Sequence, residues 1–562
     1  QRGAPLLFLS APLPAFHPSP TTSKAPPHRS PAPPRRTRSE TSGTGGGGTR
    51  APRDMGEYRA FPDGDAAAMT AVPVLPSSAT HPSQEVAAKP RYGSCDRWYM
   101  KQVFDNLHGN ISLDPLALQF VDTEEFQSFL GGLTMISFPC IMPFRLRDLK
   151  QLGLTYLVYP GAVHTRFEHS LGVYSLAGKV MDNLKMHQGE ELGIDRVDIQ
   201  TVKLAGLLHD IGHGPFSHLF EHEFLPRVIP GSTWSHEQMS VLLLDSIVDK
   251  HAIDIEADYL KMIKEMIVAS SKFATAKSAK DKHFLYDIVA NGRNGIDVDK
   301  FDYIGRDCRA CGLGCNFQYW RLTEGMRVMG DEICYPAKDY LSVHKLFTTR
   351  ADLHRTVYTH AKVKAVELML VDALVEANDY LGISLHANDP EDFWKLDDTV
   401  IKSIETAPNN ELKKSKEIIQ RIRRRELYKF CNQYSVPRDK LEHFKDITAQ
   451  DIVCSQSSSE DLKEEDIAVS NVKIDLTRGK DNPLESIKFF KDFGCNEKFP
   501  ITDDRVSHLL PAYNQDRIVR VYAKKPELVE AVSKAFENLQ LRMYGEKTQV
   551  HDTPKKKRIR FN

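Results

Sequence analysis

The sequence has few cysteines, almost no net charge and no long apolar run, and each shortage excludes a class of protein. Nine cysteines in 562 residues are too few for a disulfide-built scaffold and favour reduced thiols. The 74 lysines and arginines nearly balance the 75 aspartates and glutamates. This balance excludes a wholly basic nucleic-acid coat and an acidic tail protein, but it is compatible with a local basic pocket.

No apolar run reaches the roughly 20 residues that a membrane-spanning helix needs. The nearest candidate, residues 128–144, contains Pro139, Pro143 and a Gly131-Gly132 pair. Because proline and glycine interrupt helices, this segment is not predicted to cross a bilayer, and no membrane partner is expected.

Proline is concentrated at the front of the chain. Half of the 32 prolines lie within residues 5–90, together with four consecutive glycines at 45–48. Such a composition cannot bury enough apolar surface to offset chain entropy, so residues 1–93 are predicted to be a disordered leader. Residues 1–54 are rich in arginine, as organelle transit peptides are. The favoured interpretation is that 1–54 are not part of the mature protein, because a more acidic stretch opens at Met55.

From about residue 94 the sequence becomes periodic. Leucines and isoleucines at helical spacing occur in 204–211, and comparable patterns predict helices over 236–248, 259–270 and 350–380. Late in the chain, alternating segments predict strands at 469–476 and 517–523, followed by a helix at 527–541. The predicted fold is mainly α, with a helical domain at 94–454, an acidic loop at 455–466, a small C-terminal α/β lobe at 467–545 and a basic tail at 546–562.

Four side chains form a candidate metal site: His169, His209, Asp210 and Asp299. His209 and Asp210 end an apolar helix, where neighbouring side chains can converge on one ion. Two imidazoles and two carboxylates suit Fe(II), Mn(II) or Zn(II) better than Ca(II). In a chain with 21 histidines one His-Asp pair is weak evidence, and the surrounding segments add the weight: HTRFEHSLG at 164–172, HDIGHGPFSH at 209–218 and NGIDVDKFDY at 294–303.

These segments resemble the H…HD…D signature of HD-domain phosphohydrolases. With the W-x-HEQ segment at 234–238, they resemble more narrowly the eukaryotic deoxynucleoside triphosphate triphosphohydrolases that pair a sterile-alpha-motif module with an HD domain. The resemblance runs from about Val103 to Lys525 and implies an HD-domain helical core. Residues 1–93 do not resemble the sterile-alpha-motif module.

The resemblance implies metal-dependent cleavage of a deoxynucleoside triphosphate (dNTP) to a deoxynucleoside and inorganic triphosphate, which limits cellular dNTP pools. One transition metal ion at the HD site (iron, manganese or zinc) and magnesium bridging the nucleotide phosphates are implied cofactors. The implied catalytic residues are His213, His218, Glu221 and His236. Among them, His218 gives a proton to the leaving 5′-oxygen and is oriented by Glu221, where the family usually has Asp.

Eight residues are implied in substrate binding. Three cations meet the triphosphate, and the others surround the sugar: Arg166, Lys300, Arg350, Gln151, Leu152, Tyr303, Asp307 and Tyr358. Packing of Tyr358 and Leu152 against the sugar implies exclusion of a 2′-hydroxyl. Thr359 stands where the family commonly has Gln near the base, which predicts little base selectivity.

Family members are activated by a guanine nucleotide and a dNTP bound between subunits, which assembles a tetramer. The resemblance therefore implies GTP and dNTP activators and a dimer-to-tetramer assembly here. The implied activator residues are Asp122, Gln127, Arg147, Val158, Arg321, Lys338 and His360. Residues 128–144 interrupt what is one helix in the family, which predicts a broken helix and impaired activation. The favoured explanation of this atypical insert is an alternative splice product or a retained intron.

Other signals leave alternatives open. The run PKKKRIR at 554–560 predicts nuclear import, with some protein in the cytoplasm. Arg421, Arg423, Arg424 and Arg425 form either a site for single-stranded nucleic acid or a solvated face. The rival functions are a different HD phosphohydrolase acting on a cyclic or guanosine polyphosphate, and a catalytically impaired single-strand-binding scaffold.

Overall fold

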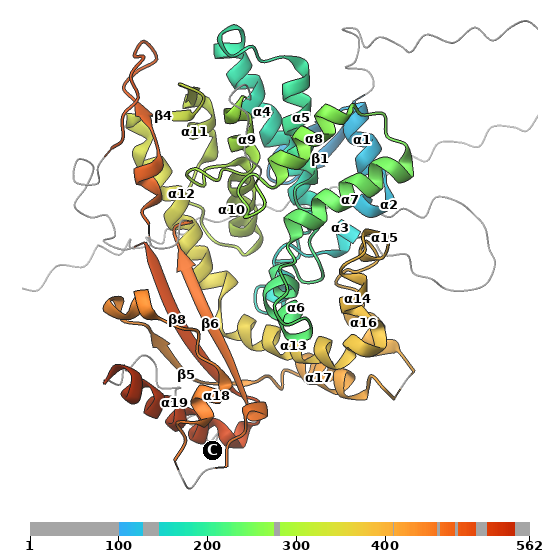
Figure 1. Cartoon of the computed structure of the whole chain (residues 1–562), viewed down its shortest axis with the longest axis vertical. Coiled ribbons are helices and arrows are strands. Elements are labelled where there is room, and N and C mark those ends of the chain that lie inside the picture. Colours follow the sequence, from blue (N-terminus) through green and yellow to red (C-terminus); the bar gives the residue numbers. More distant parts are fainter. Residues whose placement is uncertain are drawn as a thin grey trace, which may run out of the picture. The chain divides into compact units, whose positions relative to one another are not determined.

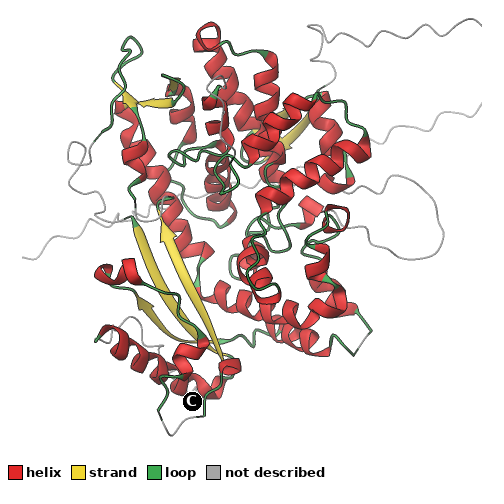
Figure 2. Cartoon of the chain, viewed as in Figure 1, coloured by secondary structure: helices red, strands yellow, loops and turns green. Residues whose placement is uncertain are grey.

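The computed structural model describes residues 100–127, 145–274, 282–408, 410–457, 461–477, 481–501 and 514–545, and the following account concerns these. The predicted leader (1–93), insert (128–144) and basic tail (546–562) lie outside the described residues. Helices dominate the described part, which confirms the predicted mainly α class (Figures 1 and 2).

Two antiparallel helices lie at the centre of the helical domain: α4 (Arg166–Leu192) and α5 (Arg196–Leu208). Asp195 is the N-cap of α5 and forms a capping box with Asp198. α10 (Val298–Ala310) packs on α4, while α8 (Ala257–Ile267) and α9 (His283–Val289) pack on α5. The other helices of this half are α1 (Pro115–Val121), α2 (Glu124–Gln127), α3 (Arg145–Asp148), α6 (Leu225–Val228) and α7 (His236–His251).

The predicted helix over 350–380 is interrupted. α12 (Tyr340–Leu353) runs into a π-helical turn, η5 (His354–Tyr358), and α13 (Ala361–Leu381) starts afresh. The break occurs because His360 leaves helical geometry and its ring accepts a hydrogen bond from the backbone N–H of Lys362, as a helix cap does. The other helices are α11 (Tyr319–Gly325), α14 (Ile383–His386), α15 (Pro390–Phe393), α16 (Val400–Thr406), α17 (Lys413–Arg423), α18 (Ala449–Val453) and α19 (Val529–Tyr544).

The C-terminal part contains an antiparallel sheet in the order β5-β8-β6. Its strands are β5 (Lys429–Ser435), β6 (Ile467–Asp475) and β8 (Gln515–Ala523), and the last two confirm the predicted alternating segments. Two further sheets were not predicted because their strands are short: β1 (Lys101–Asp105) with β2 (Gly109–Leu113), and β3 (Arg327–Val328) with β4 (Ile333–Pro336) and β7 (Phe489–Phe490).

The two faces of β6 join different apolar clusters. Ala468, Val472 and Ile474 belong to the main helical core, whereas Ile467 and Val469 pack with α19 in a second cluster. This alternation is the period of a strand buried on both faces. The sheet therefore shares its core with the helical domain. No helix among the described residues is long and apolar enough to cross a membrane.

Candidate active site

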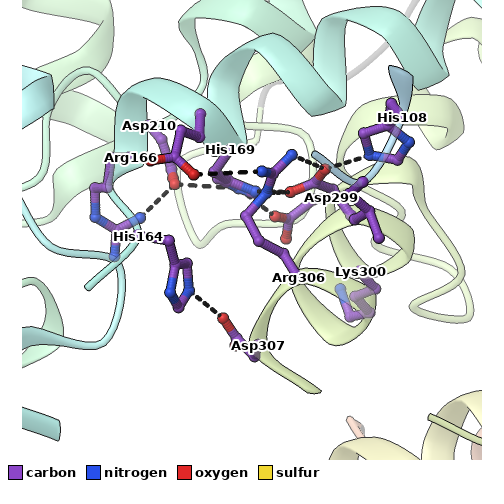
Figure 3. A network of polar contacts seen from close by, with 12 residues as sticks. His108, His164, Arg166, His169, Asp210, Asp299, Lys300, Arg306 and Asp307 are labelled. Carbon is purple, nitrogen blue, oxygen red and sulfur yellow. Dashed lines mark hydrogen bonds and ion pairs between the residues drawn. The ribbon is translucent and has the colours of Figure 1, made fainter. Parts of the chain in front are cut away.

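The four predicted metal ligands converge from three parts of the chain, and Figure 3 labels three of them: His169, Asp210 and Asp299. His169 lies in the first turns of α4, His209 and Asp210 follow α5, and Asp299 lies in the first turn of α10. The Nε2 atom of His169 lies 3.4 Å from a carboxylate oxygen of Asp210 and 3.1 Å from one of Asp299. The Nε2 atom of His209 lies 3.4 Å and 3.5 Å from the same two carboxylates.

Each of these imidazoles keeps one nitrogen for a metal ion. The Nδ1–H of His169 donates to Asp302 at 2.7 Å, and that of His209 donates to the carbonyl of Gly206 at 2.8 Å. The Nε2 atoms of both histidines are buried and form no hydrogen bond within the described part of the chain. Because a proton on Nδ1 leaves the Nε2 lone pair free, the donor set fits a divalent transition metal ion.

The carboxylates of the site are held ionised. Burial would raise the pKa of Asp210, but the neighbouring charges of His209 and Arg166 keep it well below its usual range. Arg166 donates directly to Asp210 and also bonds Ser217 at 3.0 Å. The imidazoles of His169 and His209 likewise lower the pKa of Asp299 against the effect of burial. Two ionised carboxylates supply the negative charge that a divalent cation requires.

Asp302 supports the candidate metal site by bonding the Nδ1 atom of His169. This role was not predicted from the sequence. Asp302 is fully buried and accepts hydrogen bonds from His108 at 2.6 Å and from Arg306 at 2.8 Å, in addition to His169. A Cβ atom on Gly172 would lie 2.0 Å from its carboxylate oxygen, so the glycine of the FEHSLG motif provides room. The available signal was its position three residues after Asp299, on the same face of a helix.

Three predicted catalytic histidines form a cluster beside the metal site. The rings of His213 and His236 stack with centroids 3.8 Å apart, and the ring of His218 lies edge-on to both. Glu221 lies in the π-helical turn η3 (Phe220–Phe224), which faces the start of α7. It accepts a hydrogen bond of 2.7 Å from His236, whereas the sequence expectation gave it to His218.

The three histidines of the cluster differ in the direction in which their surroundings shift the pKa. Burial would lower the pKa of His236, but Glu221 raises it above 6.5. Burial and the nearby charge of His236 lower the pKa of His218 to about 3. Burial and the charge of Arg166 also depress the pKa of His213. Of the three rings, His236 is therefore the one whose surroundings favour the protonated form.

A single cavity of about 660 Å³ adjoins these groups. Its lining includes all eight predicted substrate-binding residues: Gln151, Leu152, Arg166, Lys300, Tyr303, Asp307, Arg350 and Tyr358. It also includes Asp210 and Asp299 from the metal site and all three catalytic histidines. A cavity of this size suits a nucleotide.

Hydrogen bonds fix the polar groups of the cavity. Asp307 accepts from Tyr358 at 2.6 Å and from His164 at 2.7 Å, as Figure 3 shows for the latter pair. Arg350 donates to the hydroxyl of Tyr303 at 3.2 Å. His164 was not predicted individually, although it stands in the HTRFEHSLG segment.

Arg145 holds the loop that follows the His-Asp pair. Its side chain is fully buried over the ring of Phe393, with 4.6 Å between guanidinium and ring centroid. The guanidinium donates to the carbonyl of Ile211 and, at 2.7 Å, to that of His213. The sequence carried no signal of this role, because a buried arginine cannot be told from a surface one by pattern alone.

None of the seven predicted activator residues belongs to the described lining of the cavity. Arg147 stacks on the ring of Phe167 at 3.6 Å, and Asp122 is the C-cap of α1. Arg321 pairs with Asp339, next to Lys338. The ring of His360 contacts that of Tyr159, next to Val158. Gln127 ends α2.

The four arginines of 421–425 all have partners inside the protein. Arg421 donates to the carbonyl of Lys524 and Arg425 to that of Leu157. The other two pair with carboxylates: Arg423 with Glu405 and Arg424 with Glu426. Their interpretation as a nucleic-acid site gains no support from these contacts.

Comparison with known families assigns the class. An HD domain model matches residues 166–291, and a model of the HD associated region matches residues 317–550. The first match covers three of the four converging ligands, and Asp299 lies outside it, a few residues beyond its end. The fold and the site thus define an HD-domain protein with a candidate divalent-metal centre.

Individual relatives narrow the class to a family. The deoxynucleoside triphosphate triphosphohydrolase SAMHD1 homolog of Dictyostelium discoideum is 38% identical over 78% of this chain and 80% of that protein. The SAMHD1 enzyme of Gallus gallus is 36% identical over 78% and 74%, and that of Homo sapiens 35% over 76% and 71%. The chain belongs to the SAMHD1 family of deoxynucleoside triphosphate triphosphohydrolases, as the resemblance of its motifs predicted.

Proposed function

We propose that this protein hydrolyses deoxynucleoside triphosphates to a deoxynucleoside and inorganic triphosphate. One observation carries the proposal beyond family membership. The free Nε2 atoms of His169 and His209 face two ionised carboxylates, beside the one cavity that all eight predicted substrate residues line. A phosphate ester entering this cavity would meet both a candidate cation site and the cluster of three histidines.

The polar residues of the site are proposed to fall into two groups, one that binds a metal ion and one that binds the triphosphate. His169, His209, Asp210 and Asp299 would hold a divalent ion (iron, manganese or zinc), which supplies Lewis acidity toward a phosphoryl oxygen. Arg166, Lys300 and Arg350 would neutralise the triphosphate, and a magnesium ion would supply further positive charge to its phosphates. These cations are already oriented by hydrogen bonds, so little ordering entropy is lost when the substrate binds.

His236 is the proposed donor of the proton that the leaving 5′-oxygen takes up. Glu221 raises the pKa of His236 and so favours its protonated form, whereas burial lowers the pKa of His218 to about 3. A donor must carry its proton when the bond to the leaving oxygen breaks. His218 and His213 then act as neutral hydrogen-bonding partners of the phosphates.

Deoxyribose selectivity is assigned to the sugar pocket. The hydroxyl of Tyr358 is bound to Asp307, which fixes the ring in the cavity wall together with Leu152. A fixed aromatic ring leaves no room for an additional 2′-hydroxyl, so ribonucleotides are excluded by steric means.

The regulatory part of the proposal is that GTP and a dNTP activate the protein by assembling a tetramer. Hydrolysis by the activated protein then limits the dNTP pools in the nucleus. None of the activator residues belongs to the described lining of the cavity, which supports a regulatory site separate from the substrate site. The PKKKRIR segment at 554–560 supports nuclear import.

The deciding experiment is incubation of the purified protein with dGTP, GTP and Mn(II) or Mg(II), with triphosphate release measured by ion-exchange chromatography. The Asp210→Ala variant is expected to be inactive, whereas a matched change at exposed Asp352 leaves activity intact. Hydrolysis of a cyclic or guanosine polyphosphate without triphosphate release would instead identify a different HD phosphohydrolase. Tight single-strand binding with no hydrolysis would indicate the scaffold.

A further inference from the structure

A charged cluster in the cavity wall has no part in the roles assigned above. Lys364, in the first turn of α13, bonds Glu367 at 2.8 Å and Glu223 of η3 at 3.3 Å. All three line the cavity, and the side chains of Lys364 and Glu367 are only 13% and 16% exposed. We call Glu223, Lys364 and Glu367 the acidic wall.

The acidic wall carries a net negative charge, because two carboxylates face one ammonium. It would repel a triphosphate, whose place is fixed instead by Arg166, Lys300 and Arg350. Tyr358, which is proposed to contact the sugar, ends η5, and Lys364 lies in the first turn of the next helix, α13. Tyr358, Thr359 and Lys364 all line the cavity. The uncharged nucleobase is the part of a dNTP that can lie against the acidic wall.

The hydrogen-bonding capacity of the acidic wall selects among bases. Lys364 has three N–H donors and uses two on the carboxylates, while the carboxylate oxygens keep most of their lone pairs. The wall thus offers many acceptors and one donor. Guanine presents the complement, with N1–H and an N2 amine as donors beside an O6 acceptor. Thymine offers one donor, and hypoxanthine lacks the amine.

Resting on the proposed function, we propose that the acidic wall binds the guanine edge and makes dGTP the preferred substrate of this site. This departs from the expectation drawn from Thr359 alone, which predicted little base selectivity, because the acidic wall is a separate group of side chains in the cavity lining. A site built to accept hydrogen bonds rejects an analogue that lacks the donor, because buried acceptors then remain unpaired.

The test compares dGTP with dITP, which differs only by the missing N2 amine. Both nucleotides are hydrolysed together in one mixture with saturating GTP, so that the same activated enzyme acts on both and their relative rates give the ratio of the two kcat/KM values. Wild-type kcat/KM is expected to be roughly tenfold to a hundredfold lower for dITP, as for loss of a hydrogen bond to a charged group. In Glu367→Gln the ratio is expected to shrink severalfold. Glu376→Gln, on the exposed side of the same helix, is expected to keep the wild-type ratio.

Equal kcat/KM for dGTP and dITP would overturn the inference, and so would a preference for dATP or dCTP over dGTP. The acidic wall would then only tie η3 to α13. Calorimetric binding of the α-thio analogues of dGTP and dITP, with GTP saturating, tests the same ratio without turnover. Weaker binding of the dITP analogue supports the inference, and equal binding overturns it. Absence of triphosphate release from every dNTP would overturn the proposed function separately.

Discussion

Asp302 determines which nitrogen His169 turns toward the metal site. Its carboxylate receives the Nδ1–H of that ring and is itself held by His108 and Arg306. Such partners of a ligand histidine affect metal affinity although they never touch the ion.

The Asp302→Asn variant is accordingly expected to bind metal about 10- to 100-fold more weakly. The measurement is metal content after dialysis against a graded chelator series, with circular dichroism to confirm folding. Asp352→Asn, at a side chain that is 71% exposed, serves as the control. A folded Asp302→Asn protein with wild-type metal retention would contradict this role.

The Glu221–His236 pair makes a prediction about pH. Glu221 raises the pKa of His236 above 6.5, against the effect of burial. Removing this carboxylate lets burial dominate, so the pKa falls and the proton is lost at lower pH. For Glu221→Gln we expect the alkaline limb of the kcat–pH profile to move to lower pH by about one unit or more.

The matched control for this experiment is Glu221→Asp, which keeps a carboxylate and matches the residue usual in the family. Its alkaline limb is expected to lie between those of the wild type and Glu221→Gln. Identical profiles for all three proteins would exclude His236 as the proton donor.

At the scale of elements, the two helices that flank residues 128–144 link this insert to the candidate active site. α2 ends at Gln127, α3 begins at Arg145, and the two contact each other. Arg145 then bonds the carbonyls around the catalytic loop, so the segment after the insert is tied to the active site. The metal site is intact in the described structure with α2 and α3 as separate helices.

Deleting residues 128–144 is expected to restore one helix across this junction and to bring Gln127 and Arg147 into register. Tetramer formation with GTP and dNTP should then rise, and the hydrolysis rate with it. Sedimentation velocity and triphosphate release measure the two effects. Equal assembly and activity with and without the segment would refute the proposed role of the insert.

At the scale of the whole molecule, the C-terminal sheet belongs to the active-site architecture. β6 contributes Ser470, Asn471, Val472 and Lys473 to the cavity lining. The backbone carbonyl of Asp475 accepts a hydrogen bond of 2.7 Å from Arg350, one of the cations proposed to bind the triphosphate. The lobe therefore completes the wall of the candidate substrate cavity.

Two truncated proteins test the separate roles proposed for the C-terminal lobe and the basic tail. A chain ending at Gly545 lacks only the basic tail and is expected to keep hydrolysis while losing nuclear accumulation of a fluorescent fusion. A chain ending at Cys454 lacks β6 and β8, exposes the main core and is expected to aggregate or lose activity. Full activity of the shorter chain, or unchanged localisation of the longer one, would contradict the respective assignment.

The sequence by itself determined the helical class, the two late strands and the family, and it predicted the candidate metal ligands. These depend on periodicity and on motifs whose members lie close together in the chain, such as His209 with Asp210. It did not reveal the break before α13, because the apolar period continues through it while the backbone changes at His360.

Only the tertiary structure decided which side chains act on one another. The pairing of Glu221 with His236, the hold of Arg145 on the catalytic loop and the acidic wall each join segments that are distant in sequence. Residue type sets what a group can donate, accept or ligate. Packing sets its distance, burial and neighbouring charge, and these physical quantities determine which group carries the proton and which atom is left for the metal ion.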